Sequence, residues 1–177
     1  MMLWLNIAAI PLLFIFGWLF SQAMILVNTT NPFPKGIWGV FTAFTGLEII
    51  ALPISILLML VFHEMVHGIF FWIFTRERPK FAFKGMYAYA AAPGWFLPKS
   101  QYVIVGLSPL IVISLLSILL SPFVSASIIP YLFIIAIFNA AGALGDMIVV
   151  AWVIGQFDQL LIQDQGDKFL AFSPRKE

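Results

Sequence analysis

Cysteine is absent from this chain, and charged residues make up only 10% of its 177 positions. Without thiols the chain can form no disulfides, supply no thiolate metal ligands and use no cysteine nucleophile. The scarcity of charge, beside a hydrophobic fraction of 62%, leaves too little polar surface to cover a soluble domain of this size. The composition therefore predicts an integral membrane protein.

Four apolar runs are long enough to cross the roughly 30 Å of hydrocarbon in a bilayer. They are residues 3–27, a long run that ends at Phe74, residues 102–120 and residues 128–156. The second run could include an interfacial segment over residues 38–47, with the spanning helix starting again near Pro53. Proline lacks a backbone N–H, and the first turn of a helix tolerates this loss. We expect an all-α membrane protein with four transmembrane helices, in which residues 1–156 form one domain and residues 157–177 a polar cytoplasmic tail.

The nine Lys and Arg residues fall almost entirely on one side of these spans. Lys35 alone lies between the first and second helices, and the connection between the third and fourth has none. The others follow the second or the fourth helix: Arg76, Arg78, Lys80, Lys84, Lys99, Lys168, Arg175 and Lys176. Because cytoplasmic loops are enriched in Lys and Arg, we expect both termini in the cytoplasm and an uncleaved first helix. Anionic lipid headgroups account for these cations, and a net charge of +1 does not indicate nucleic-acid binding.

Both histidines of the chain lie in the pentapeptide His63-Glu64-Met65-Val66-His67, inside the second apolar run. Residues four apart on a helix differ by about 40° in direction and 6 Å in height, so both imidazoles can reach one ion. Zinc accepts such nitrogens at about 2.0–2.1 Å. Glu64 lies about 100° further round the helix, where a carboxylate can accept a proton from a water molecule activated by the metal. The pattern predicts a zinc site with a catalytic base.

Charge within the expected spans is confined to three carboxylates, Glu48, Glu64 and Asp146, with no Lys or Arg beside them. Buried carboxylates without a cation must either be protonated or be balanced by a bound positive ion. A Zn²⁺ ion would supply that charge and would make the site formally neutral with Glu64 and Asp146 ionised. Glu48 lies about 22 Å along the helix from His63 and is expected to take no part.

The third zinc ligand follows by elimination. The chain has no third histidine, and the only later glutamates are Glu77, at the end of the helix, and Glu177, the last residue. The remaining aspartates lie in the polar tail, except Asp146. Asp146 is about 15 Å from the cytoplasmic end of its helix. His67 and His63 are about 10 and 16 Å from the cytoplasmic end of theirs. The depths in the membrane agree, so Asp146 is the expected third ligand.

Small residues occupy most of the segment from Asn139 to Asp146 and would let two helices approach closely. Asn139 lies two turns from Asp146 on a similar face, so it is a candidate for holding the substrate backbone or orienting a ligand. The alternative is an Asn that bridges membrane helices without a role in the chemistry.

The His-Glu-Met-Val-His-Gly motif, the segment from Asn139 to Asp146 and the four-helix plan together resemble the bacterial putative zincin peptidase family of membrane proteins. More distantly they resemble the site-2 intramembrane metalloproteases. The resemblance covers roughly residues 48–156. It implies His63, His67 and Asp146 as zinc ligands and Glu64 as the catalytic base. Site-2 proteases carry a proline-rich segment ending in Leu-Asp-Gly, whereas this chain has Gly142 in place of prolines and Met147 after the aspartate.

Aromatic residues alternate between the second and third helices: Phe81, Phe83, Tyr87 and Tyr89 flank a turn signal at Lys84-Gly85. This period of two predicts a short β-hairpin. A hairpin beside the site could bind a substrate segment as an added strand, with Tyr87 and Tyr89 against it. The alternative is an aromatic anchor at the membrane interface.

The sequence therefore favours an intramembrane zinc metallopeptidase that acts on membrane-protein or peptide substrates in the lipid bilayer. The alternative is a zinc-binding membrane scaffold that does not hydrolyse peptides, which the missing Leu-Asp-Gly segment motivates. For hydrolysis, water must reach the site from the cytoplasmic side. The sequence leaves the particular substrate and the oligomeric state open.

Overall fold

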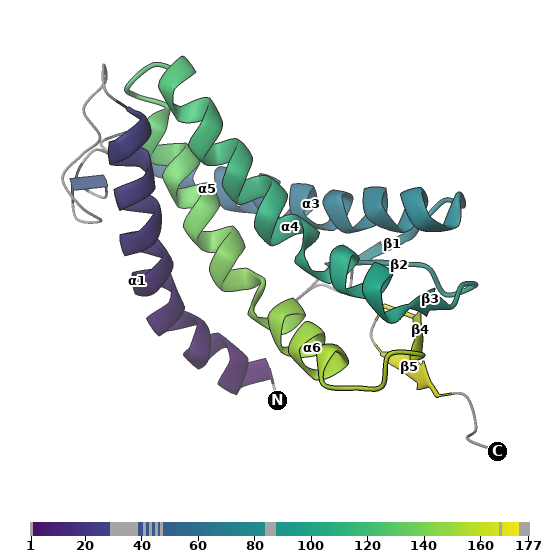
Figure 1. Ribbon diagram of the computed structural model, residues 1–177. Coiled ribbons are helices and arrows are strands. Elements are labelled where there is room, and N and C mark those ends of the chain that lie inside the picture. The colour runs from purple at the N-terminus through teal and green to yellow at the C-terminus, as the bar shows by residue number, and fades with distance from the viewer. Residues whose placement is uncertain are drawn as a thin grey trace. The chain divides into compact units, whose positions relative to one another are not determined.

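The computed structural model describes residues 2–28, 39–40, 42, 44, 46, 48–83, 88–166 and 168–173. Over these residues the chain is mostly helical (Figure 1). The helices are α1 (Met2–Val27), α3 (Glu48–Thr75), α4 (Lys99–Leu120), the 3-10 helix η1 (Ser121–Phe123), α5 (Ile129–Gly142) and α6 (Leu144–Ile154). The strands are β1 (Lys80–Phe83), β2 (Ala88–Ala91), β3 (Leu97–Pro98), β4 (Leu161–Asp164) and β5 (Phe169–Phe172).

Among the residues that the structure describes, three helical segments are long and apolar enough to cross a membrane. They are Ile7–Val27, Ile49–Thr75 and Lys99–Phe123. In hydrocarbon every backbone N–H and C=O must be bonded within the protein, which is why such apolar runs fold as helices. Helices α5 and α6 meet the same criterion as a bent pair, which would give a fourth span. The chain is thus a membrane protein with three or four candidate spans.

The prediction of one continuous helix over residues 128–156 is wrong. α5 ends at Gly142, and α6 begins at Leu144 after a turn at Ala143. Gly142 and Gly145 flank this turn, and glycine is a poor residue for a helix interior. The break places Asp146 in the first turn of α6. A carboxylate is favoured there, because the first turn of a helix has unpaired N–H groups and the positive end of the helix dipole.

The chain divides into two compact units, of which the first comprises Met1–Leu60 and Leu110–Leu144. Its hydrophobic core joins α1 to α5 and includes Phe20, Met24, Phe133, Ile134 and Ile137. The buried side chain of Asn28 follows α1 and donates hydrogen bonds to the Met24 carbonyl and to Ser121 Oγ in η1. The end of α1 is thereby tied to η1.

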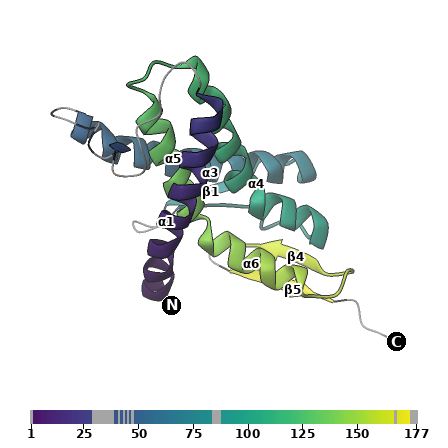
Figure 2. The ribbon, with the colours of Figure 1, turned by 60° about the vertical axis from the view of Figure 1, so that its left-hand side comes forward.

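The second unit comprises Val61–Pro109 and Gly145–Glu177. It contains the second half of α3, the start of α4, nearly all of α6 and the five strands. Its core includes Phe71, Leu97, Tyr102, Val105, Val153, Leu160 and Ile162. Figure 2 shows α6 alongside β4 and β5, where the rings of Trp152 and Phe169 lie 5.4 Å apart.

Strands β1 and β2 lie within the segment for which alternating aromatic residues predicted a hairpin. They pair antiparallel, with Phe81 opposite Ala90. The turn signal at Lys84-Gly85 and Tyr87 lie outside the described residues. Gly68 of α3 leaves room for the ring of Phe81, which a Cβ at position 68 would overlap. This close approach holds β1 against α3.

The segment after residue 156 forms strands, although its charged residues predicted a solvated tail. β4 pairs with β3 and β5, with Ile162 opposite both Leu97 and Ala171, and Ile162 is fully buried. Short apolar stretches at residues 160–162 and 169–172 explain the strands. In the turn between them, Gly166 has φ +94° and lies against the ring of Tyr89 in β2. The C-terminal strands therefore pack on the first hairpin.

Substituting Gly166 tests this packing. Gly166→Ala should lower the thermal unfolding midpoint in detergent for two reasons, a left-handed backbone and overlap of the new Cβ with the Tyr89 ring. Gly46→Ala is the matched control, because Gly46 has φ +58° and nothing within 4 Å of an added Cβ. We expect Gly166→Ala to lower the free energy of unfolding by about 1–3 kcal/mol more than the control does, which is the usual range for overpacking. Equal shifts would show that the turn does not pack on β2.

Candidate metal centre

The two histidines lie on one face of α3, a turn apart. Both residues are buried, with His63 8% and His67 9% exposed, and their rings are 4.9 Å apart. The neighbouring Phe62, Met65 and Ile69 are 44–55% exposed. The helix therefore presents its imidazoles to the protein interior and an apolar surface to its surroundings.

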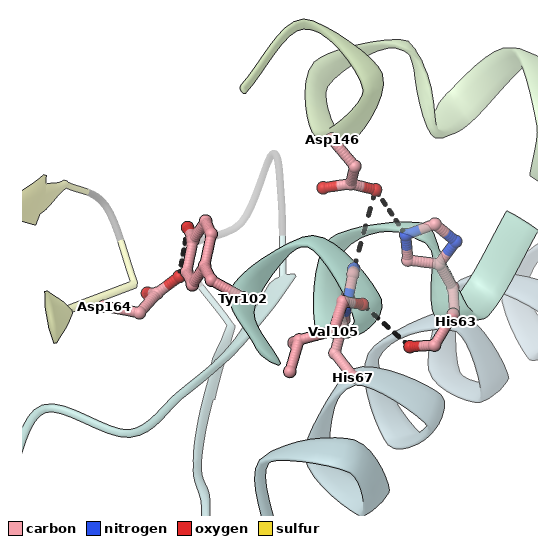
Figure 3. Close-up of polar contacts among 7 residues, drawn as sticks. His63, His67, Tyr102, Val105, Asp146 and Asp164 are labelled. Atoms are coloured by element: carbon pink, nitrogen blue, oxygen red, sulfur yellow. Dashed lines mark hydrogen bonds and ion pairs between the residues drawn. The ribbon is translucent and has the colours of Figure 1, made fainter. Parts of the chain in front are cut away.

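Asp146 approaches the same point from α6. Its Oδ2 lies 3.1 Å from Nε2 of His63 and 3.5 Å from Nε2 of His67 (Figure 3). Each of the three residues offers one ligand atom within 4.8 Å of the others. In tetrahedral zinc sites with bonds of about 2.0–2.1 Å, neighbouring ligand atoms are about 3.3 Å apart. The two distances from Asp146 Oδ2 are thus close to the spacing in a tetrahedral zinc site, and the chemistry of the three donors fits the ion.

The hydrogen bond of His67 leaves its other ring nitrogen available to a cation at this point. Its Nδ1 lies 2.9 Å from the backbone carbonyl oxygen of Val105 in α4. A carbonyl can only accept a hydrogen bond, so Nδ1 carries the proton and donates it. In the neutral ring, Nε2 then has a lone pair that faces the carboxylate oxygen of Asp146. Two lone pairs at this distance repel each other unless a second proton or a metal ion lies between them.

Helix α6 is brought close to α4 by a glycine. A Cβ at Gly106 would overlap the Val150 side chain, so the absence of a side chain at position 106 sets how near the helices come. Val150 lies one turn after Asp146, on the same face of α6. The Gly106–Val150 contact therefore helps to set the position of the carboxylate beside the histidines.

Glu64 lies beside the three donors. Its side chain is partly buried, and its carboxylate interacts with the backbone N–H of Ala90 in β2. Glu64 directly follows His63 and precedes His67 by three residues. A carboxylate at this position beside a metal can accept and release a proton during hydrolysis.

Asp164 forms a second polar cluster that sequence reasoning missed (Figure 3). Its Oδ2 accepts a hydrogen bond from the Tyr102 hydroxyl at 2.8 Å, and its Oδ1 accepts one from the Gly166 N–H at 2.8 Å. Burial raises the pKa of this carboxyl above its usual range, and the two bonds offset the rise only in part. Asp164 thereby ties β4 to the first turn of α4, ahead of Val105.

The other residues predicted for substrate binding are Asn139, Tyr87 and Tyr89. Asn139 lies in the first unit, where its side chain is fully buried. Tyr87 lies outside the described residues. Tyr89 lies in β2 with its ring against Gly166. The role of the Val105 carbonyl was also missed. Its one signal in the sequence is Pro109, four residues later.

Two histidines and an aspartate on apolar helices, with a glutamate beside them, are a group that could hold a metal ion, and zinc peptidases use donors of this kind. The family described as putative zincin peptidase matches residues 56–160, which is more than half of the chain. The chain therefore belongs to this family, and a zincin family implies zinc as the metal. Comparisons with curated proteins and with solved structures give no match. The family match contains all four residues of the centre and ends just before β4.

The raised pKa of Asp164 predicts how stability changes with pH. The folded protein binds this proton more tightly than the unfolded chain does, so the stabilisation is fully present below the unfolded pKa of about 4 and is lost as the pH rises through the folded pKa. Tyr102, His67 and Asp146 also act on Asp164. Comparison of an Asp164→Asn variant with the wild type therefore reports the contribution of Asp164 together with its interactions with these three groups.

We expect the thermal unfolding midpoint of the wild type to fall more steeply above about pH 4 than that of Asp164→Asn. The measurement is a series of unfolding curves in detergent across this pH range. Asp158→Asn is the control, because it makes the same change at an exposed aspartate whose ion-pair partner is Lys99. Identical slopes in the wild type and Asp164→Asn would contradict a raised pKa.

Proposed function

We propose that this protein is an intramembrane zinc metallopeptidase that hydrolyses peptide bonds of membrane-associated substrates. The observation that carries the proposal is the convergence of His63 Nε2, His67 Nε2 and Asp146 Oδ2. A carboxylate on an apolar helix is costly unless it is paired or functional, and a bound cation would supply the missing charge. Membership of the zincin peptidase family supports peptidase chemistry.

The residues of the centre have separate roles in the proposed reaction. Zinc bound by the three donors would supply a Lewis acid that polarises the scissile carbonyl and makes water nucleophilic near neutral pH. Glu64 takes the proton of the attacking water and gives it to the leaving amine. The Ala90 N–H interacts with the Glu64 carboxylate beside these ligands. The Val105 carbonyl keeps His67 in the tautomer whose Nε2 can bind a metal.

Strand β2 is the proposed binding place for substrate. A peptide bond in a helix is inaccessible, so a membrane segment must be extended before it is cut. β2 lies against Glu64 through Ala90, and an extended segment could pair with a strand at this position. The assignment of Tyr87, Tyr89 and Asn139 to substrate binding stays a prediction.

The proposed setting is a lipid bilayer with both termini in the cytoplasm. The distribution of Lys and Arg supports this orientation when the bent pair of α5 and α6 is counted as a fourth span. Water would enter from the cytoplasmic side, and the substrate would be a membrane protein or a peptide derived from one. This mode of action resembles that of site-2 metalloproteases.

Glu64→Gln tests the chemistry. The amide cannot take a proton from water, so cleavage of a membrane-segment peptide by purified protein should fall by about 10²–10⁴-fold, while zinc content stays at the wild-type level. Glu48→Gln is the matched control, since it changes the other glutamate of α3, fifteen residues before His63. Undiminished cleavage in Glu64→Gln would remove Glu64 from the mechanism. A wild type that binds zinc but cleaves no membrane segment would favour the scaffold alternative.

Asp146→Ala tests the ligand set. Removing one of three protein ligands should leave purified protein with little zinc, whereas the wild type should carry one zinc per chain. Elemental analysis measures the content, and Asp158→Ala, which removes an exposed aspartate, should retain it. A full complement of zinc in Asp146→Ala would contradict the assignment.

A further inference from the structure

Pro109 lies inside α4, one turn after Val105. In an α-helix the carbonyl of residue i accepts a hydrogen bond from the N–H of residue i+4. Proline has no N–H, so the carbonyl of Val105 loses its usual partner. Two side chains donate to this oxygen instead, the His67 ring through Nδ1 at 2.9 Å and the Ser108 hydroxyl at 2.7 Å.

The hydrogen bonds at this oxygen fill its capacity. A backbone carbonyl has two lone pairs and therefore accepts two good hydrogen bonds. His67 and Ser108 take both of them, and the two bonds are buried. An N–H at position 109 would be a third donor aimed at the same atom from within the helix. It would displace either the hydroxyl or the imidazole.

We propose that Pro109 is a positioning residue of the metal centre, which reserves the Val105 carbonyl for His67 by removing the competing N–H. The reserved bond keeps the proton on Nδ1 and turns Nε2 toward Asp146 Oδ2, 3.5 Å away. This inference rests on the proposed zinc function, and it assigns to α4 a share in orienting a ligand that α3 carries. Outer partners of metal-binding histidines typically change metal affinity 10–100-fold when they are lost.

The variant that tests the proposal is Pro109→Ala, which restores the N–H. Its affinity for Zn²⁺, measured by competition with a chelator, should be about 10–100-fold weaker than that of the wild type. Pro53→Ala is the matched control, because Pro53 also lies inside a membrane-length helix, in the half of α3 that belongs to the first unit. It should bind zinc like the wild type. Equal affinity in Pro109→Ala and the wild type would overturn the proposal.

A double variant separates competition for the carbonyl from a general change in helix shape. Ser108→Ala removes one of the two donors, so in Ser108→Ala/Pro109→Ala the carbonyl can accept both the new N–H and His67. Zinc affinity should therefore recover toward the wild-type value, a non-additive effect expected only of groups that share a partner. A double variant as weak as Pro109→Ala alone would overturn the proposal.

The visible absorption of the Co²⁺-substituted proteins gives a second readout that does not depend on hydrolysis. Pro109→Ala should show an altered or weaker Co²⁺ spectrum, and the double variant should restore it. A wild type that binds neither metal would remove the proposed function and this inference with it. Tight binding by the wild type and by Pro109→Ala alike would remove this inference and leave the proposed function standing.

Discussion

The structure depends on the meeting of three electron-rich atoms in an apolar setting. Nε2 of His63, Nε2 of His67 and Oδ2 of Asp146 converge from two helices, and no Lys or Arg lies in the apolar segments that carry them. Without a proton or a cation between them these atoms would repel one another, and the carboxylate would be costly to bury. A divalent ion removes both costs, and in doing so it would bind α3 to α6.

The surrounding elements can be understood as supports for this arrangement. Gly106 admits α6 close to α4, and the Val105 carbonyl fixes His67. The N–H of Ala90 interacts with Glu64 from the hairpin side. The C-terminal strands hold that hairpin in turn, through Gly166 against the Tyr89 ring. The centre is thus built from side chains on helices and oriented by backbone groups of α4 and β2.

Much of this centre follows from the sequence, because the helical spacing of the histidines and the scarcity of acidic residues in the apolar runs leave few choices. Two histidines four apart and a single aspartate among apolar residues could be paired by elimination. The break before Asp146 could have been inferred from Gly142 and Gly145, but the apolar run hid it. The strands after residue 156 were missed because their apolar stretches are only three or four residues long. The role of the Val105 carbonyl could not be predicted, since it depends on tertiary contact between two helices.

The most direct test of this account is zinc-edge X-ray absorption spectroscopy of the purified protein. The account predicts one zinc per chain with two imidazole nitrogens and oxygen ligands at about 2.0–2.2 Å. Protein that carries no zinc after purification and reconstitution, or zinc whose scattering contains no imidazole shell, would contradict it.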